Sequence, residues 1–147
     1  MEQDPSKEVL IDTEHLRLLS LFHYISGGLT IAFSSIFIFH LLFFSLIANN
    51  PQFKESTQTQ LNGFSPADFI SIFIYIFGAI IALGIIYGIA QVIAGYFIKQ
   101  RQYRLFIIIV AIPNVLFIPY GTLLSVFTLI VLGRPHVVAL FNHSATP

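Results

Sequence analysis

Three long stretches of the chain lack Asp, Glu, Lys and Arg altogether: residues 18–53, 69–98 and 105–133. Apolar side chains, mainly Ile, Leu and Phe, dominate each of them. A helix needs about 20 mostly apolar residues to cross the ~30 Å hydrocarbon core of a bilayer, so every stretch is long enough to span. The pattern predicts an all-α integral membrane protein that crosses the bilayer several times.

The first two helices have local start signals. Asp12 precedes the first apolar stretch and is a residue type that caps helix N-termini. Ser65 is followed by Pro66, and a capping residue before a proline is typical of a helix start. These signals predict helices over Asp12–Ile47 and Pro66–Ile98, with membrane-spanning parts at about 18–47 and 69–98 and a polar loop over Asn49–Ser65.

The third stretch has two interpretations. It can form one long tilted helix over residues 105–132, which gives three long spans. Pro113, Pro119 and Gly121 interrupt it, however, and favour a hairpin with a turn near residue 119. The hairpin arms would cover about 102–118 and 121–134, each short for a ~30 Å core, with an interfacial stretch beyond Arg134-Pro135. We favour the hairpin, and therefore four transmembrane helices.

Charge sets the expected orientation. Lys99, Arg101 and Arg104 lie in one short loop, 99–104, that contains no acidic residue. Loops rich in Lys and Arg stay in the cytoplasm, so this loop is expected inside and the loop 49–65 outside. The hairpin also brings Arg134 to the inside, which predicts a multi-pass protein with both termini cytoplasmic.

Small and polar residues follow helical spacing in both of the first two helices. Residues spaced alternately four and three apart share one face of a helix. Such faces let helix backbones approach closely in lipid, either within a chain or between copies. We expect the two faces to pack on each other, or to form a seam between protomers. The residues are Gly84, Gly88, Gln91 and Gly95 in the second helix and His23, Gly27, Thr30 and Ser34 in the first.

Three polar residues inside the apolar stretches are candidate ligands or relay groups: His23, Asn114 and His40. An ionisable group in a membrane helix is a functional hypothesis, and imidazole can relay protons or bind haem. The structural alternative for His23 is a neutral ring with one hydrogen bond, for which we expect Gln91 as the partner. For Asn114, beside Pro113, the alternatives are an ion site at a broken helix and a simple kink.

Composition excludes several classes of function. The chain is 56% hydrophobic and 10% charged, has a formal net charge of +0 and contains no cysteine, so neither nucleic-acid binding nor thiolate chemistry is indicated. It has no set of residues arranged as in a known catalytic, phosphate-binding or metal site. We therefore expect no enzyme activity, cofactor or metal.

Segments at both ends carry a resemblance to other proteins. They are Glu14-His15-Leu16-Arg17-Leu18-Leu19, Phe22-His23-Tyr24 and Gly27-Gly28-Leu29, and Pro119-Tyr120-Gly121-Thr122-Leu123, Val126-Phe127-Thr128, Val131-Leu132 and Arg134-Pro135. They resemble the opening and closing motifs of a group of small uncharacterised bacterial polytopic inner-membrane proteins. The resemblance implies a bacterial inner membrane and no particular activity.

The expected function is non-enzymatic association in the membrane, as a homo-oligomer or as an accessory subunit of a membrane complex. The expected partners are the lipid bilayer and other membrane-protein subunits. Two alternatives stay open: a channel or small transporter, and a component of electron transfer associated with haem or quinone.

Overall fold

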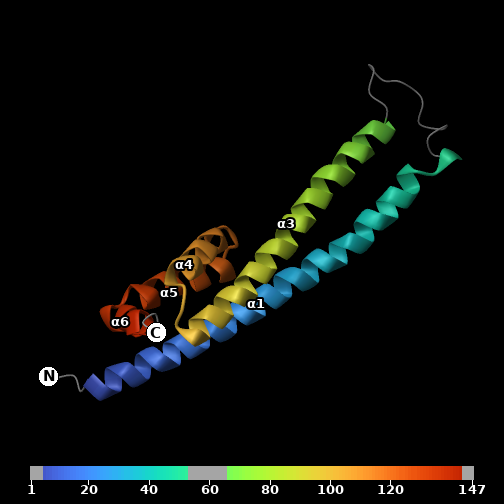
Figure 1. Cartoon of the computed structure of the whole chain (residues 1–147). Helices are drawn as coiled ribbons and strands as arrows, with labels where there is room; N and C mark the ends of the chain where they lie inside the picture. The colour runs from blue at the N-terminus through green and yellow to red at the C-terminus, as the bar shows by residue number, and fades with distance from the viewer. Residues whose placement is uncertain (1–4, 53–65, 144–147) are drawn as a thin grey trace. The chain divides into compact units, whose positions relative to one another are not determined.

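The computed structural model describes residues 5–52 and 66–143, and within these ranges the chain forms helices and turns but no strand (Figure 1). The all-α prediction is confirmed for this part. The elements are α1 (Pro5–Ala48), α3 (Pro66–Gln100), α4 (Arg104–Ala111), the 3₁₀ helix η1 (Ile112–Leu116), α5 (Tyr120–Gly133) and α6 (Pro135–His143).

Two of the described helices, α1 and α3, are long and apolar enough to cross a membrane. A third crossing is reached only if α5 and α6, which are bent by 74° at their junction, count as one span. These lengths and compositions are those of a helical membrane protein. The arms formed by α4 with η1 and by α5 are too short to pass the same test, so four spans are not confirmed.

Helix boundaries agree with the predictions at α3 and differ at α1. Helix α3 begins at Pro66 as expected and ends at Gln100. Helix α1 begins at Pro5, so the prediction that Asp12 caps it is wrong. Nothing in the preceding residues stops the helix, and the Asp12 carboxylate is needed elsewhere, because it pairs with Arg134. The proposed cap Ser65 and most of the loop 49–65 lie outside the described residues.

A sharp turn joins α3 to α4. The Gln102 amide donates to the carbonyl of Phe97, and the Arg101 amide donates to that of Ile98. This pair of hydrogen bonds is a Schellman motif, which requires a left-handed residue after the helix. Arg101 takes that conformation with φ 55°, and Tyr103 follows with φ 50°. The turn places the start of α4 beside the end of α3.

Residues 105–132 form a hairpin and not one helix. Helix α4 ends at Ala111, η1 continues to Leu116, and α5 starts at Tyr120. Arg104 Nε donates to the carbonyl of Leu132 at 3.0 Å, which joins the outer ends of the two arms. Thr122 Oγ1 donates to the carbonyl of Val115 at 2.9 Å, which joins their inner ends. The arms are therefore antiparallel, and the alternative of one long third helix is wrong.

The prolines that break the segment act as the sequence suggested. Pro113 lies in η1 and has no amide to donate, and Pro119 stands immediately before α5. A Cβ at Gly121 would collide with the backbone oxygen of Asn114 and with the side chain of Phe117. Only glycine lets α5 start this close to η1.

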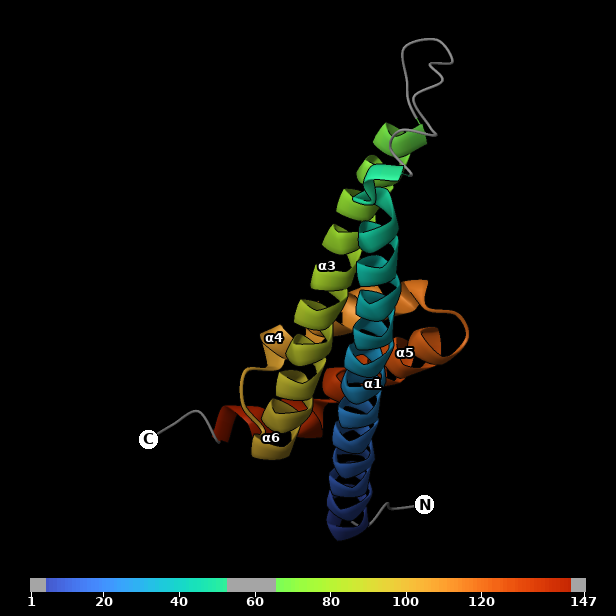
Figure 2. The ribbon, with the colours of Figure 1, turned by 90° about the vertical axis from the view of Figure 1, so that its right-hand side faces the viewer.

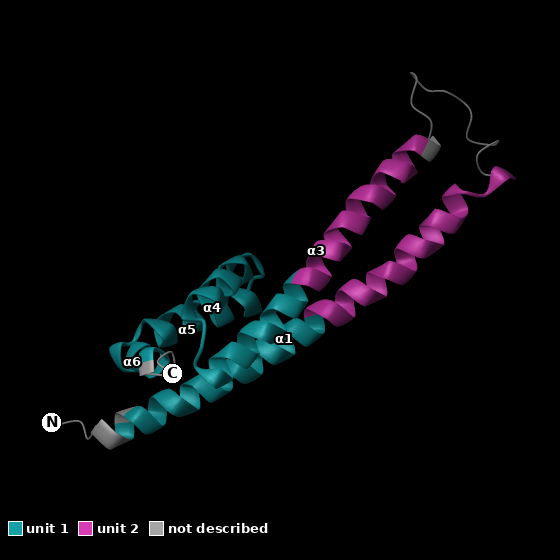
Figure 3. Ribbon diagram, viewed as in Figure 1, with its two compact units in different colours: residues 1–29, 87–147 teal, residues 30–86 magenta. Residues whose placement is uncertain are grey.

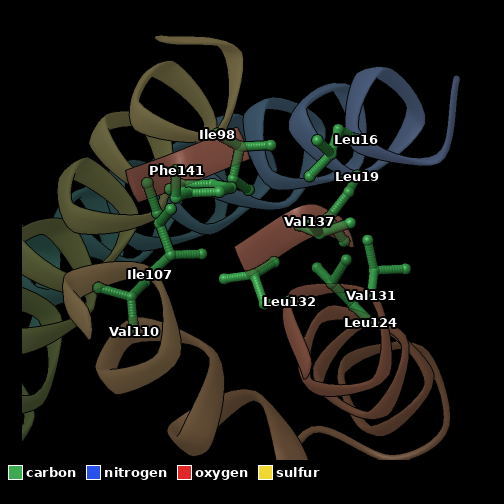
Figure 4. Close-up of a cluster of buried hydrophobic side chains, with 11 residues drawn as sticks. Leu16, Leu19, Ile98, Ile107, Val110, Leu124, Val131, Leu132, Val137 and Phe141 are labelled. Atoms are coloured by element: carbon green, nitrogen blue, oxygen red, sulfur yellow. The ribbon is translucent and has the colours of Figure 1, made fainter. Parts of the chain in front are cut away.

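The chain divides into two compact units (Figure 3). Unit 1 comprises residues 1–29 and 87–147, and unit 2 comprises residues 30–86. Unit 1 contains the apolar core, to which α1, α3, α4, α5 and α6 all contribute (Figure 4). The core residues are Leu16, Leu19, Ala94, Ile98, Ile107, Val110, Leu124, Val131, Leu132, Val137 and Phe141.

Unit 2 is a pair of helix segments, α1 from residue 30 and α3 up to residue 86 (Figure 2). A Cβ at Gly84 would lie 2.5 Å from Ser34 Oγ, and one at Gly78 would lie 3.8 Å from Leu41 Cδ1. These contacts make the pair antiparallel. Among the residues of unit 2 whose burial is described, only Ala48 and Ile81 are buried. Nearly all of its large apolar side chains face outward, as lipid-facing helices do.

Candidate functional site

In unit 1 the two predicted small-residue faces meet. A Cβ at Gly27 would lie 2.7 Å from the carbonyl oxygen of Gly88, and a Cβ at Gly95 would lie 3.0 Å from that of Ser20. Ser20 Oγ also donates to the carbonyl of Gly95 at 2.7 Å. The glycines thus allow α1 and α3 to touch through their backbones. In this unit the face serves packing within the chain.

Unit 2 holds the other predicted members of these faces. Gly84 lies against Ser34, as described above, and Thr30 is half-buried. In unit 2, as in unit 1, residues of the two predicted faces thus lie opposite one another, with Ser34 opposite Gly84.

The imidazole of His23, on the α1 face that packs against α3, is completely buried, with 0% of the residue's surface exposed. Its Nε2 lies 3.2 Å from Thr128 Oγ1 of α5. Thr128 Oγ1 in turn donates to the carbonyl of Leu124 at 2.6 Å. The predicted His23–Gln91 hydrogen bond is wrong, because α5 brings a hydroxyl to the imidazole that the spacing of the first two helices could not reveal.

Gln91 pairs with Asn114 instead. Gln91 Nε2 donates to Asn114 Oδ1 at 3.0 Å, and each residue is 1% exposed. The break between α4 and α5 allows this contact, because η1 carries Asn114 inward. One turn away, Tyr87 OH donates to the carbonyl of Val110 at 2.8 Å, which ties α3 to the same arm.

Four buried polar atoms of these side chains have no hydrogen-bond partner among the described residues: His23 Nδ1, Gln91 Oε1, Asn114 Nδ2 and Ser125 Oγ. They come from α1, α3, η1 and α5. Leaving one buried polar group unpaired costs about 1–3 kcal/mol. Four such groups would together cost about 4–12 kcal/mol, which is comparable with the whole stability of a small domain, about 5–15 kcal/mol. We call these residues, with Thr128, the polar cluster.

The members of the polar cluster, which come from four elements, lie at successive levels along the axis of α5. Gly121 lies against Asn114, Ser125 comes one turn later, and Thr128 contacts His23 another three residues on. At about 1.5 Å per residue the distance along the helix axis from Gly121 to Thr128 is about 10 Å. The Asn114–Gln91 pair therefore lies at one end of the polar cluster, His23 lies at the other, and Ser125 lies between them.

A second, charged group lies where α5 meets α6. Arg134 Nη1 is 2.6 Å from Asp12 Oδ1 and 3.2 Å from His15 Nδ1. Along the chain, the core residues Leu16 and Leu19 lie between His15 and His23, and the core residue Val131 lies between Thr128 and Arg134. The ion pair closes the first turns of α1 against the C-terminal helices.

The other histidines singled out in the sequence have separate surroundings in the described part of the chain. His40, in unit 2, is exposed, and its Nδ1 lies 3.2 Å from the carbonyl of Ile36 in the same helix. His15 contacts Arg134, whereas His23 contacts Thr128. Across the described ranges, no three His, Asp or Glu side chains come together as a metal site would require.

Ser125, Thr128 and the Asp12–Arg134 ion pair are not among the predicted site residues. Ser125 and Thr128 lie three residues apart in an uncharged stretch, which is the same signal that identified the faces of the first two helices. The ion pair had no local signal, because 122 residues separate its members. Together the positions describe a buried, uncharged hydrogen-bonding site inside a membrane bundle. No protein-family model, curated protein or solved structure matches this chain.

Proposed function

We propose that this protein is a non-enzymatic component of a bacterial inner membrane that acts through association, with copies of itself or with other membrane-protein subunits. One observation supports this function most directly. Helix α1 has a second small-residue face, at Gly28, that nothing in the described chain covers. Small residues on an exposed helix face are what helix association in lipid uses.

The second face is distinct from the one that packs on α3. Apart from the neighbouring backbone of α1 itself, no atom of the described chain lies within 4 Å of the place where a Gly28 Cβ would stand. Ala32, four residues on, is exposed, and Ser35 is half-buried with its hydroxyl donating to Ile31 O at 2.8 Å. In unit 1, Gly28 therefore leaves the backbone of α1 uncovered, and in unit 2 Ala32 and Ser35 offer small side chains without an unpaired hydroxyl. A helix from another chain can approach the backbone there.

Substitution at neighbouring glycines tests the proposal. Gly28→Leu covers the open backbone of α1, so the protein should stay folded and lose its oligomer or partner. Gly27→Leu places its side chain against Gly88 and should unfold the bundle. Gly133→Leu is the matched control, because it also points into open space. Native mass spectrometry and thermal unfolding in detergent report both properties, and an unchanged assembly in the folded Gly28→Leu variant refutes the proposal.

Native mass spectrometry of the protein gently extracted from its own membrane separates the two forms of association. A single species of several identical chains identifies a homo-oligomer. Co-purified foreign subunits identify an accessory subunit. A visible spectrum of the same sample tests the electron-transfer alternative, since bound haem gives a Soret band.

We further propose that α1 and α3 cross the membrane, whereas the α4–η1–α5 hairpin, described in unit 1, enters and leaves on the side of the basic loop 99–104. Tyr87 stacks on Phe117 at the hairpin tip with ring centroids 6.4 Å apart. Tyr87 is twelve residues from Lys99, so the tip reaches about 18 Å along α3, less than the ~30 Å core. At the tip, Leu116 and Ile118 are each 82% exposed. A hairpin tip that lay in water would carry polar side chains at such positions.

The expected four-span topology makes a different prediction for that tip. The chain contains no cysteine, so single cysteines can be introduced as reporters. A cysteine replacing Ile118 should resist membrane-impermeant maleimide from both sides, whereas four spans require labelling from outside. A cysteine replacing Gln102 is the control and should label from the cytoplasmic side. Both topologies keep the two termini cytoplasmic.

A channel or small transporter is the second candidate, favoured by the unpaired atoms of the polar cluster. Polar groups inside a bundle of membrane helices often bind the ion or solute that a channel or transporter passes. Flux measurements in liposomes with the purified protein test it. Transport that disappears in Asn114→Leu while the protein stays folded would establish this function, and absence of flux for ions and small neutral solutes would remove it.

A further inference from the structure

The hydrogen-bonding state of His23 follows from its partner. Thr128 Oγ1 donates its only hydrogen to the carbonyl of Leu124, at 2.6 Å. It can therefore only accept from His23 Nε2, 3.2 Å away, so Nε2 carries the imidazole hydrogen. In the neutral ring the other nitrogen, Nδ1, is then a bare acceptor, and it is completely buried without a partner in the described chain.

The same hydrogen bonds argue against a proton relay through His23. A proton leaving Nε2 would pass to Thr128 Oγ1, whose own hydrogen points at a backbone carbonyl that does not carry protons onward. The relay would end at that carbonyl. The geometry makes His23 a fixed acceptor, suited to holding a hydrogen-bond donor in one place.

The Gln91–Asn114 pair leaves one donor and one acceptor free. As assigned, Gln91 Nε2 donates to Asn114 Oδ1, and Gln91 Oε1 and Asn114 Nδ2 have no partner. Exchanging oxygen and nitrogen in both amides reverses the bond and again leaves one oxygen and one NH₂ group unpaired. The result does not depend on the assignment.

Ser125 supplies the fourth group, a hydroxyl that can both donate and accept. The residue is 0% exposed and stands one turn before Thr128 on the same face of α5. The polar cluster contains no Asp, Glu, Lys or Arg, and the carboxylate of Asp12 is held by Arg134. A bound ion would find no opposite charge here, whereas an uncharged molecule would find donors and acceptors together.

We propose that the polar cluster is a binding site for small uncharged molecules that carry a hydroxyl group, of which water is the smallest. The bound hydroxyl donates to His23 Nδ1 and accepts from Ser125 Oγ. A second such molecule, at the other end of the polar cluster, bridges the free oxygen and NH₂ group of the Gln91–Asn114 pair. The site is independent of the association proposed above, because its residues face the interior of unit 1.

Two serines of unit 1 provide a matched thermodynamic test. Ser20 is buried and its hydroxyl is paired with the carbonyl of Gly95, whereas the Ser125 hydroxyl has no partner within the described chain. If a bound molecule satisfies Ser125, Ser125→Ala should lower the Tm by about as much as Ser20→Ala, in the range of about 2–8 °C. If Ser125 is truly unpaired, Ser125→Ala should leave the Tm unchanged or raise it, and that result overturns the proposal.

The wild-type protein supplies a second measurement that does not depend on a variant folding. In ¹⁵N-histidine-labelled protein in lipid nanodiscs, a hydrogen bond to Nδ1 moves its resonance upfield from that of a free imidazole lone pair. Magnetisation transfer from water to the His23 ring identifies water as the ligand. An upfield Nδ1 resonance without such transfer identifies a larger hydroxyl compound, to be named by mass spectrometry of the denatured sample. An Nδ1 resonance at the free position overturns the proposal.

Discussion

Arg134 Nη1 lies 2.6 Å from Asp12 Oδ1, and this contact joins the first turns of α1 to the junction of α5 and α6. The Asp12 side chain is 6% exposed and that of Arg134 is 38% exposed. The carboxylate therefore depends on its partner much more than the guanidinium does. A buried aspartate carboxylate is tolerated only with such a partner.

Removing the arginine should cost more than removing both charges. Arg134→Met leaves Asp12 buried and unpaired, and we expect a loss of about 1–3 kcal/mol in the free energy of unfolding. The double variant Asp12→Asn with Arg134→Met should recover part of that loss. Chemical denaturation in detergent micelles measures both. Equal stability of the single and double variants would show that the unpaired Asp12 carboxylate does not destabilise the protein.

The amide pair of Gln91 and Asn114 should behave as a coupled unit. Gln91→Leu or Asn114→Leu alone leaves one buried amide without its partner, at a cost of about 1–3 kcal/mol. The double leucine variant should lose clearly less than the two single losses together, because residues in direct contact are not additive. Strict additivity in a double-mutant cycle would mean that the two amides do not interact in the membrane.

Gly121 and Gly133 form a matched pair of glycines on α5. A Cβ at Gly121 meets the backbone oxygen of Asn114, whereas one at Gly133 meets nothing in the described chain. Gly121→Ala should therefore destabilise the protein by about 1–3 kcal/mol through overpacking. Gly133→Ala should change stability by no more than about 1 kcal/mol. Thermal unfolding followed by circular dichroism compares them, and similar Tm values would contradict the close approach of α5 to η1.

Thr122 tests where the hairpin tip lies. Its hydroxyl donates to the carbonyl of Val115, which the broken helix leaves without a backbone partner. In hydrocarbon an unpaired carbonyl is expensive, whereas water would replace the lost bond. Thr122→Val should therefore destabilise the bilayer-embedded protein by about 1–3 kcal/mol. A negligible effect in nanodiscs would indicate that water reaches the tip.

Much of the fold was predictable from local sequence. The uncharged stretches predicted the long helices, Pro66 marked the start of α3, and Pro113, Pro119 and Gly121 marked the hairpin. These features depend on residues close together in the chain, such as a missing amide or an uninterrupted apolar run. The start of α1 was missed because Asp12 is a good cap by type and is used as an ion-pair partner instead.

The polar contacts were less accessible to the same reasoning. Spacing correctly placed His23 and Gln91 on facing surfaces of α1 and α3, but not their hydrogen-bond partners. The partners are Thr128 for His23 and Asn114 for Gln91, and both belong to the hairpin. A side chain forms a hydrogen bond with whichever suitable group lies within about 3 Å of it. Helical periodicity specifies the direction in which a side chain points from its own helix axis. It does not specify which residues of another helix lie at the same level.

The amino-acid sequence by itself determined that the chain is helical, belongs in a membrane and turns back on itself near residue 119. Apolar runs and prolines act over a few residues, so they can be interpreted without coordinates. Only the tertiary structure decided that His23 bonds Thr128, that Asp12 pairs with Arg134, and which buried polar atoms have no partner within the described chain. Those outcomes depend on how helices separated by about a hundred residues pack, because hydrogen bonds form only at short range.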